Sequence, residues 1–289
     1  MNMKMDYHLH TEFSDDSREP MENQVERAIE LGFREICFTD HVDYGVKNDW
    51  SDGNIKYRIG DGVGKPEGSL DPIANVDYPL YFEKLRLMKK MYGDRIEIKQ
   101  GLEFGMQTIT VDKYEKLFAR YKDELDFVLL SIHEIDNKEL WTMDYQRERS
   151  WKEYNEGYYN ELYQVMKIYK DYNVLSHLDL IVRYDPQGRY PFEKVEDQVA
   201  EILKLAISDG KGIEINTSSW HYGLDDTMPS RQILKLYKDL GGKIITIGSD
   251  GHTTRYVGDH FEDAVSILKE IGFTHIAGFT KMKPQLHEI

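Results

Sequence analysis

The sequence predicts an α/β fold, a closed barrel of parallel strands and outer helices built as a single domain over residues 1–289. Short apolar runs alternate with longer amphipathic segments along the whole chain. This alternation is typical of parallel strands joined by crossover helices. Seven or eight such units favour a closed barrel over an open sheet. Histidines and carboxylates also follow the ends of several strands, the rim at which parallel barrels place their sites.

The expected strands are short apolar runs bounded by polar or turn residues. They are Met5–Leu9, Glu35–Thr39, Ile96–Leu102, Phe127–Ile132, Val174–His177, Gly212–Asn216 and Lys243–Gly248. A shorter eighth candidate is His275–Phe279.

The expected helices lie between these strands. The first follows Pro20 and stops at Gly32, and a proline near the start with a glycine past the end is ordinary helix punctuation. The others have apolar residues three and four apart. They are Tyr78–Tyr92, Val111–Lys122, Trp151–Tyr172, Phe192–Ser208, Pro229–Leu240 and Phe261–Ile271.

One segment, Tyr44–Asn75, interrupts the alternation. It is rich in glycine and aspartate and too long for an ordinary connection. Such loops are usually functional or disordered. Because this one follows a strand end that bears a histidine, we expect an insertion at about 44–75 that acts as an active-site lid.

Composition excludes several classes of protein. The formal net charge of −15 argues against nucleic-acid binding and requires any phosphate site to be a local positive island. Cys37 is the only cysteine, so neither a disulfide framework nor a thiolate zinc site is expected. Neither a membrane-spanning apolar stretch nor a secretory signal is evident, and the expected location is the cytoplasm.

The histidines suggest a metal site. His8 and His10 are alternate residues of the first strand, so both can face the barrel mouth and bind one ion. Other histidines and carboxylates follow later strands: His41, Glu103, His133, His177, Asp250 and His252. Imidazole and carboxylate suit zinc, manganese or iron. The donors are too many for one ion, so we expect two or three divalent metals.

These residues resemble the PHP family, the polymerase and histidinol phosphatase metal-dependent phosphoesterases. The resemblance implies a distorted, TIM-like (β/α)7 barrel and a multinuclear metal site. The family's ligand pattern is filled in order between residues 8 and 252. Asp15 and Asp16 compete for one position, and the spacing after His8 favours Asp16. The implied ligands are His8, His10, Asp16, His41, Glu103, His133, His177, Asp250 and His252.

The phrases DYHLHTEFSDDS, ICFTDHVD, GLEFG and HLDLIVRY resemble the stand-alone L-histidinol-phosphate phosphatases of this family. That resemblance implies an enzyme of histidine biosynthesis with a small-molecule phosphate ester as substrate. A metal-bound hydroxide is expected to attack phosphorus. Arg183 and Arg149 are the preferred phosphate-binding residues. His221 is the candidate general acid or phosphate contact, and Asp16 and Arg183 complete the expected catalytic group.

Three alternatives remain open at this point. The first is a PHP phosphatase that acts on another small phosphoester. The second is an amidohydrolase, which also begins with His-x-His, although the metal-bridging lysine of that class has no evident counterpart here. The third is a metal-binding or regulatory protein without catalysis.

Overall fold

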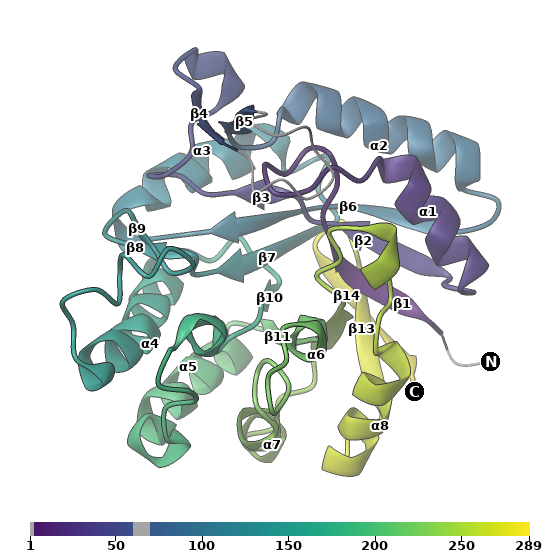
Figure 1. Ribbon diagram of the computed structural model, residues 1–289. Coiled ribbons are helices and arrows are strands. Elements are labelled where there is room, and N and C mark those ends of the chain that lie inside the picture. Colours follow the sequence, from purple (N-terminus) through teal and green to yellow (C-terminus); the bar gives the residue numbers. More distant parts are fainter. Residues whose placement is uncertain (1–2, 60–69) are drawn as a thin grey trace.

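The computed structural model describes residues 3–59 and 70–289 and contains a nearly closed parallel sheet of seven strands. Helices surround this sheet on its outer side (Figure 1). The strands, in their order around the sheet, are β1 (Met5–Leu9), β2 (Glu35–Phe38), β6 (Glu97–Gly105), β7 (Phe127–Ser131), β10 (Val174–Leu175), β11 (Gly212–Asn216) and β12 (Ile245–Gly248). This arrangement confirms the predicted barrel.

The second strand of the barrel is interrupted, and this distorts the barrel. β2 ends at Phe38, and the chain resumes as the short strand β3 (His41–Val42), which also pairs with β6. The register between β1 and β2 shifts between Asp6 and Leu9. The barrel is therefore irregular where its first two strands end.

The first and last strands of the barrel meet at a closing seam. Leu9 forms a parallel bridge with Gly251, just beyond β12. The His10 amide donates to the Gly251 carbonyl (3.0 Å), and the Gly251 amide donates to the His8 carbonyl (3.3 Å). These backbone hydrogen bonds thus close the barrel at the rim where the strands end.

Side-chain caps mark where two of the helices begin. Ser150 and Glu153 form a reciprocal capping box at the start of the fourth helix, and Asp77 accepts from the Leu80 amide at the start of the second. The helices are α1 (Met21–Glu30), α2 (Tyr78–Tyr92), α3 (Val111–Tyr121), α4 (Trp151–Ile168), α5 (Glu196–Ser208), α6 (Ser218–His221), α7 (Arg231–Asp239) and α8 (Phe261–Ile271). Short 3-10 turns are η1 (Trp50–Asp52), η2 (Thr108–Thr110), η3 (Leu180–Tyr184), η4 (Phe192–Lys194) and η5 (Thr254–Tyr256).

The eighth strand candidate forms a strand but not an eighth unit of the barrel. β13 (His275–Thr280) pairs antiparallel with β14 (Lys283–Glu288), because Lys281 and Met282 adopt left-handed backbone conformations that reverse the chain. Phe279 of this hairpin packs against Phe127, the first residue of β7, with ring centroids 4.9 Å apart. The hairpin therefore lies against the end of the barrel where the strands begin.

The insertion at about 44–75 is not a plain loop. It contains η1 and an antiparallel hairpin of β4 (Lys56–Ile59) and β5 (Leu70–Ile73). Residues 60–69 of the insertion lie outside the described residues. Arg18, in the loop after β1, pairs with Asp71 of β5 (2.6 Å). The hairpin thus contacts the rim of the barrel, and its role as a lid stays a prediction.

A membrane-spanning segment was not expected from the sequence. Within residues 3–59 and 70–289, every helix is too short or too polar to cross a bilayer.

Candidate metal centre

Glu103, in β6, lies at the centre of a cluster of histidines. Its Oε2 atom is 3.2 Å from His8 Nε2, 3.4 Å from His10 Nε2 and 3.1 Å from His41 Nδ1. His8 lies near the carboxyl end of β1, His10 directly follows that strand, and His41 begins β3. The side chains of Glu103, His8 and His10 are completely buried.

The other oxygen of Glu103 faces the opposite side of the barrel mouth. Its Oε1 atom is 3.2 Å from His133 Nε2, beyond β7, and 2.9 Å from His177 Nε2, beyond β10. The Ser131 hydroxyl donates to the same oxygen (2.6 Å). One carboxylate therefore joins histidines from four parts of the barrel.

Asp250 follows β12 across the closing seam from β1. Its Oδ1 atom is 3.3 Å from His10 Nε2 and 3.6 Å from His8 Nε2. A histidine of the first strand, a histidine just beyond it and a carboxylate beyond the last strand therefore lie close together.

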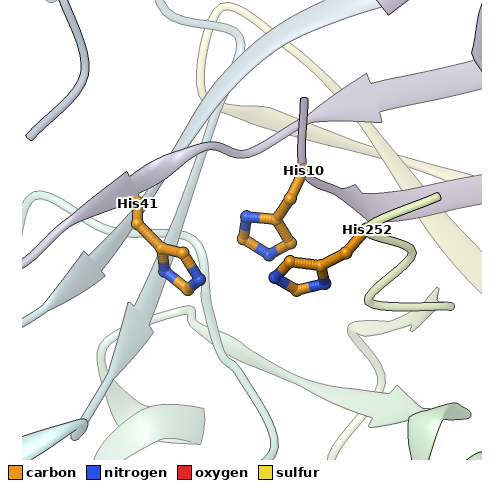
Figure 2. A group of neighbouring side chains, drawn as sticks. All are labelled: His10, His41 and His252. Atoms are coloured by element: carbon orange, nitrogen blue, oxygen red, sulfur yellow. The ribbon is translucent and has the colours of Figure 1, made fainter. Parts of the chain in front are cut away.

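Asp16 completes the cluster on its open side. Its Oδ2 atom is 3.2 Å from His252 Nε2 and 3.5 Å from His41 Nε2, and its side chain is 42% exposed. Figure 2 shows His10, His41 and His252 pointing toward one another. The His10 ring centroid lies 4.1 Å from that of His41 and 4.2 Å from that of His252. The structure thus brings together every residue of the expected ligand set.

The cluster leaves buried polar atoms without partners. His8 Nε2, His10 Nε2, His41 Nδ1 and Glu103 Oε2 are buried and form no hydrogen bond with any described residue, although they face one another. Buried polar atoms are normally satisfied, and a cation among these atoms would satisfy them. Within residues 3–59 and 70–289, four groups of three side chains have donor atoms within 4.8 Å of one another: His10, His41 and His252; His8, His10 and Asp250; His8, Glu103 and His177; and His41, Asp43 and His133. The donor set therefore fits more than one divalent metal ion.

The electrostatics of the cluster also call for added positive charge. Burial lowers the pKa of His133, but the carboxylates of Glu103 and Asp43 outweigh burial and raise that pKa to about 10. Burial raises the pKa of Glu103, but His8, His133 and His41 hold it well below its usual value. The carboxylates thus favour a positive charge among the imidazoles, either as protons or as metal ions.

Comparison with known proteins identifies the family. The model of the PHP domain matches residues 6–218, a span that holds most of the clustered residues. The chain belongs to the PHP family.

Similar proteins have related names and the same fold. A histidinol-phosphatase of Lactococcus lactis is 30% identical over 97% of this chain and 96% of its own length. A probable histidinol-phosphatase of Thermotoga maritima is 27% identical over 94% of each chain. A crystal structure of the Lactococcus lactis histidinol phosphate phosphatase, complexed with zinc, L-histidinol and phosphate, superposes with a TM-score of 0.80, 29% identity and 98% coverage of both chains.

Sequence reasoning missed the residues behind the PHP histidines. The Nδ1 atom of His8 is 2.7 Å from Glu214 Oε1, and that of His133 is 2.8 Å from Asp43 Oδ1. The Nδ1 atom of His10 is 3.2 Å from the Ser14 hydroxyl. A signal for Glu214 was present in the strand GIEIN, where a carboxylate sits between two isoleucines. Alternation then puts it on the face opposite the isoleucines.

The neighbouring aspartates Asp15 and Asp16 have different surroundings. Asp16 faces the histidines, whereas Asp15 is buried and pairs with Lys47 (2.5 Å) and Arg58 (3.1 Å). Lys47 also pairs with Asp43 (2.6 Å). Lys47 and Arg58 both belong to the insertion, and Arg58 lies in β4. The insertion therefore contacts the edge of the cluster by pairing with the carboxylates of Asp15 and Asp43. The geometry supports Asp16 as the choice between the two.

Arg183, in η3, lies beside the cluster. Its Nη2 donates to Asp250 Oδ2 (3.0 Å) and to the Ser218 hydroxyl (2.5 Å). The Tyr222 ring centroid lies 4.1 Å from the guanidinium carbon. The side chain is 8% exposed, and its Nε is buried and has no hydrogen-bond partner within residues 3–59 and 70–289. Arg183 is therefore a fixed positive charge at the metal centre.

His221, the last residue of α6, lies among aromatic rings near Arg183. Its ring stacks on Tyr256 (centroids 4.2 Å apart), and its buried Nδ1 has no hydrogen-bond partner in the part of the chain that the structure describes. Burial lowers the pKa of His221, and the nearby cations Arg183 and His252 lower it further. The ring is therefore neutral near pH 7.

Arg149, the other arginine expected at the phosphate, is tied to its own loop. Its Nη1 donates to the Tyr145 carbonyl (2.5 Å), and its guanidinium lies 4.4 Å from the centroid of the Tyr145 ring. Neither contact involves a residue of the cluster. Phosphate binding by Arg149 stays a prediction.

Proposed function

We propose that this chain is a metal-dependent phosphomonoesterase that hydrolyses L-histidinol phosphate to L-histidinol and phosphate. The observation that carries the proposal is the convergence of unpartnered histidine nitrogens on Glu103 Oε2. The substrate comes from the Lactococcus lactis relative, which is similar over nearly the whole chain. The substrate is then a small molecule that carries both a phosphate and an amine.

The metal ions are zinc, manganese or iron, with zinc favoured because the Lactococcus lactis structure contains it. They would be held by the side chains that form the four donor groups, with Asp16 on the open side. Bound ions of this kind draw charge from phosphate oxygens and lower the pKa of water, so that hydroxide is available near neutral pH.

Arg183 supplies a cation for the substrate phosphate. The guanidinium is held by Asp250 and Ser218 on one edge and by the Tyr222 ring on one face. A planar guanidinium suits phosphate oxygens, and fixing it in advance reduces the entropy lost on binding. In this chain of net charge −15, Arg183 provides the local positive charge that an anionic substrate requires.

His221 is proposed to contact the phosphate or the leaving oxygen. Because its pKa lies below the ordinary value, the neutral ring is the main form near pH 7, with one nitrogen as donor and one as acceptor. This favours a hydrogen-bond contact over delivery of a proton from the charged ring.

Phosphate release from L-histidinol phosphate tests the proposal, beside a nucleoside monophosphate and p-nitrophenyl phosphate. The protein is first treated with a chelator, and zinc, manganese or iron is then added back. We expect a strong preference for L-histidinol phosphate that is lost on chelation and restored by metal. Metal-dependent hydrolysis of the other esters alone would retain the phosphatase and reject the substrate.

A further inference from the structure

Glu214 is a completely buried carboxylate in the middle of β11. Its Oε1 lies 2.7 Å from His8 Nδ1. Its Oε2 accepts from the Ser176 hydroxyl (2.9 Å), the His177 amide (3.0 Å) and the Asn216 side-chain amide (3.1 Å). Each contact is to a neutral donor or an imidazole. Glu214 therefore differs from a carboxylate whose role is to neutralise a lysine or an arginine.

The contact with His8 determines which ring nitrogen is free. A carboxylate that already accepts from other donors also accepts from His8, so Nδ1 carries the hydrogen. The lone pair of Nε2 is then directed into the cluster, 3.2 Å from Glu103 Oε2 and 3.6 Å from Asp250 Oδ1. Glu214 thus holds His8 in the form that binds a metal.

Glu214 also acts on a second histidine through its backbone. The bond from the His177 amide fixes the chain just beyond β10, from which His177 Nε2 reaches Glu103 Oε1 at 2.9 Å. His8, Glu103 and His177 form one of the donor groups. One buried carboxylate therefore positions two of the three donors in that group.

The neighbouring strand leaves room for this arrangement. Gly248, the last residue of β12, lies against both partners, and a Cβ atom there would clash with the Glu214 carboxylate and with the Cβ of His8. Its backbone needs no positive φ, so conformational freedom is not the reason for a glycine here. The side chains of Glu214 and His8 occupy the space that a Cβ atom at position 248 would need.

We propose that Glu214 is a positioning residue that sets the metal affinity of the His8 side of the cluster. The inference rests on the proposed metal centre. A carboxylate behind a ligating histidine orients the ring and increases its basicity, and loss of such a partner costs about 10- to 100-fold in metal affinity. The group of His10, His41 and His252 does not include His8, and within the described part of the chain none of its three side chains donates to Glu214. Its ion is expected to stay bound.

The test compares zinc binding by the native protein and the Glu214→Gln variant. Zinc is withdrawn stepwise by a competing chelator and counted by mass spectrometry. We expect one ion to bind about 10- to 100-fold more weakly in the variant and another to be unchanged. Unchanged binding of every ion, or equal weakening of all, would overturn the proposal.

Glu35→Gln is the matched control. Glu35 is also a buried strand glutamate, but it begins β2, at the far end of the barrel, and pairs with Tyr7 and Lys99. We expect this variant to lose stability while its zinc affinities stay native. Weakened zinc binding in Glu35→Gln would show that loss of any buried carboxylate disturbs the site, which would reject a specific role for Glu214.

A second measurement needs no variant. Nitrogen NMR of imidazole-labelled native protein with zinc bound reports which His8 nitrogen carries the hydrogen. We expect hydrogen on Nδ1 and metal on Nε2, and the reverse assignment would overturn the proposal. If the native protein binds no zinc at all, the proposed function fails before this inference is tested.

Discussion

The two sides of the metal cluster use the same device but build it differently. On one side His8 is backed by Glu214, and on the other His133 is backed by Asp43. Each pair lies against a glycine whose added Cβ would clash with it, Gly248 in the first case and Gly105 in the second.

The surroundings of the two carboxylates differ. Glu214 lies in a strand, and among the described residues it accepts from neutral donors and imidazole, whereas Asp43 follows β3 and pairs with Lys47 of the insertion. The side chain of His8 is fully buried, and that of His133 is 15% exposed. The comparison teaches that one side of the site is set by the barrel itself, while the other depends on a segment that interrupts it.

The largest effect should come from Glu103, which both sides share. Glu103→Gln removes the charge that faces the histidines from both directions, so every ion should bind more weakly. We expect kcat to fall by more than the roughly 100-fold that loss of an outer hydrogen-bond partner costs. Metal content and steady-state hydrolysis measure it.

Glu134→Gln is the control for Glu103→Gln. Burial, with the nearby Asp43 charge, raises the pKa of Glu134 well above its usual value, so burial disfavours the charged form of this carboxyl. A neutral amide of similar shape should change activity by only about twofold. A loss as large as that of Glu103→Gln would mean that charge at the shared position is not what matters.

The next effect concerns the side that depends on the insertion. Lys47→Met leaves the buried carboxylates of Asp15 and Asp43 without their shared cation. Breaking a buried ion pair in this way costs about 3–5 kcal/mol of unfolding free energy. We also expect about a 10-fold loss in affinity for an ion on the His133 side. Denaturant unfolding and chelator competition measure the two effects.

Lys116→Met provides the comparison for Lys47→Met. Lys116 is exposed and pairs with Asp112 one helical turn away (3.2 Å). Its loss should change stability by no more than about 0.5 kcal/mol. If Lys47→Met weakened the His8 side and the His133 side equally, the two sides would not be separable.

The smallest effects separate the two arginines. Arg183→Ala removes a charge-assisted contact worth about 1.5–3 kcal/mol, or about 10- to 100-fold in kcat/KM. Arg149→Ala should change kcat/KM by about twofold, because Arg149 is held by Tyr145 in its own loop. Equal losses in the two variants would place Arg149 at the substrate after all.

The sequence predicted the barrel and the residues that gather at its rim. His8 and His10 could be assigned because they alternate in a strand, and later histidines because parallel strands end at one rim. The α2 and α8 helices were predicted to the residue from their apolar spacing, and each is followed directly by a glycine, Gly93 and Gly272. Helix α4 ends four residues earlier than expected, because Tyr169 turns to an extended conformation.

Residues that act through tertiary contacts were beyond local patterns. Glu214 pairs with His8 across the barrel, and Lys47 reaches Asp15 from within the insertion. The spacing of residues along the chain does not predict such pairs, because their members are distant in sequence. The pairing of the eighth strand candidate, His275–Phe279, with β14 was beyond reach for a related reason, since strand content does not reveal which partner a strand pairs with.

The closing seam between β1 and β12 has a consequence for the order in which the protein matures. His8 and His10 are made early in synthesis, whereas Asp250 and His252 are made near the end. A nascent chain lacks these last two donors until the final strand emerges and docks, and contacts this distant in sequence form slowly. Metal ions that bind donors from both ends of the chain would then bind late, after the first and last strands have come together. They would add their binding energy to a barrel that is already assembled, and they would resist the reopening of its first and last strands.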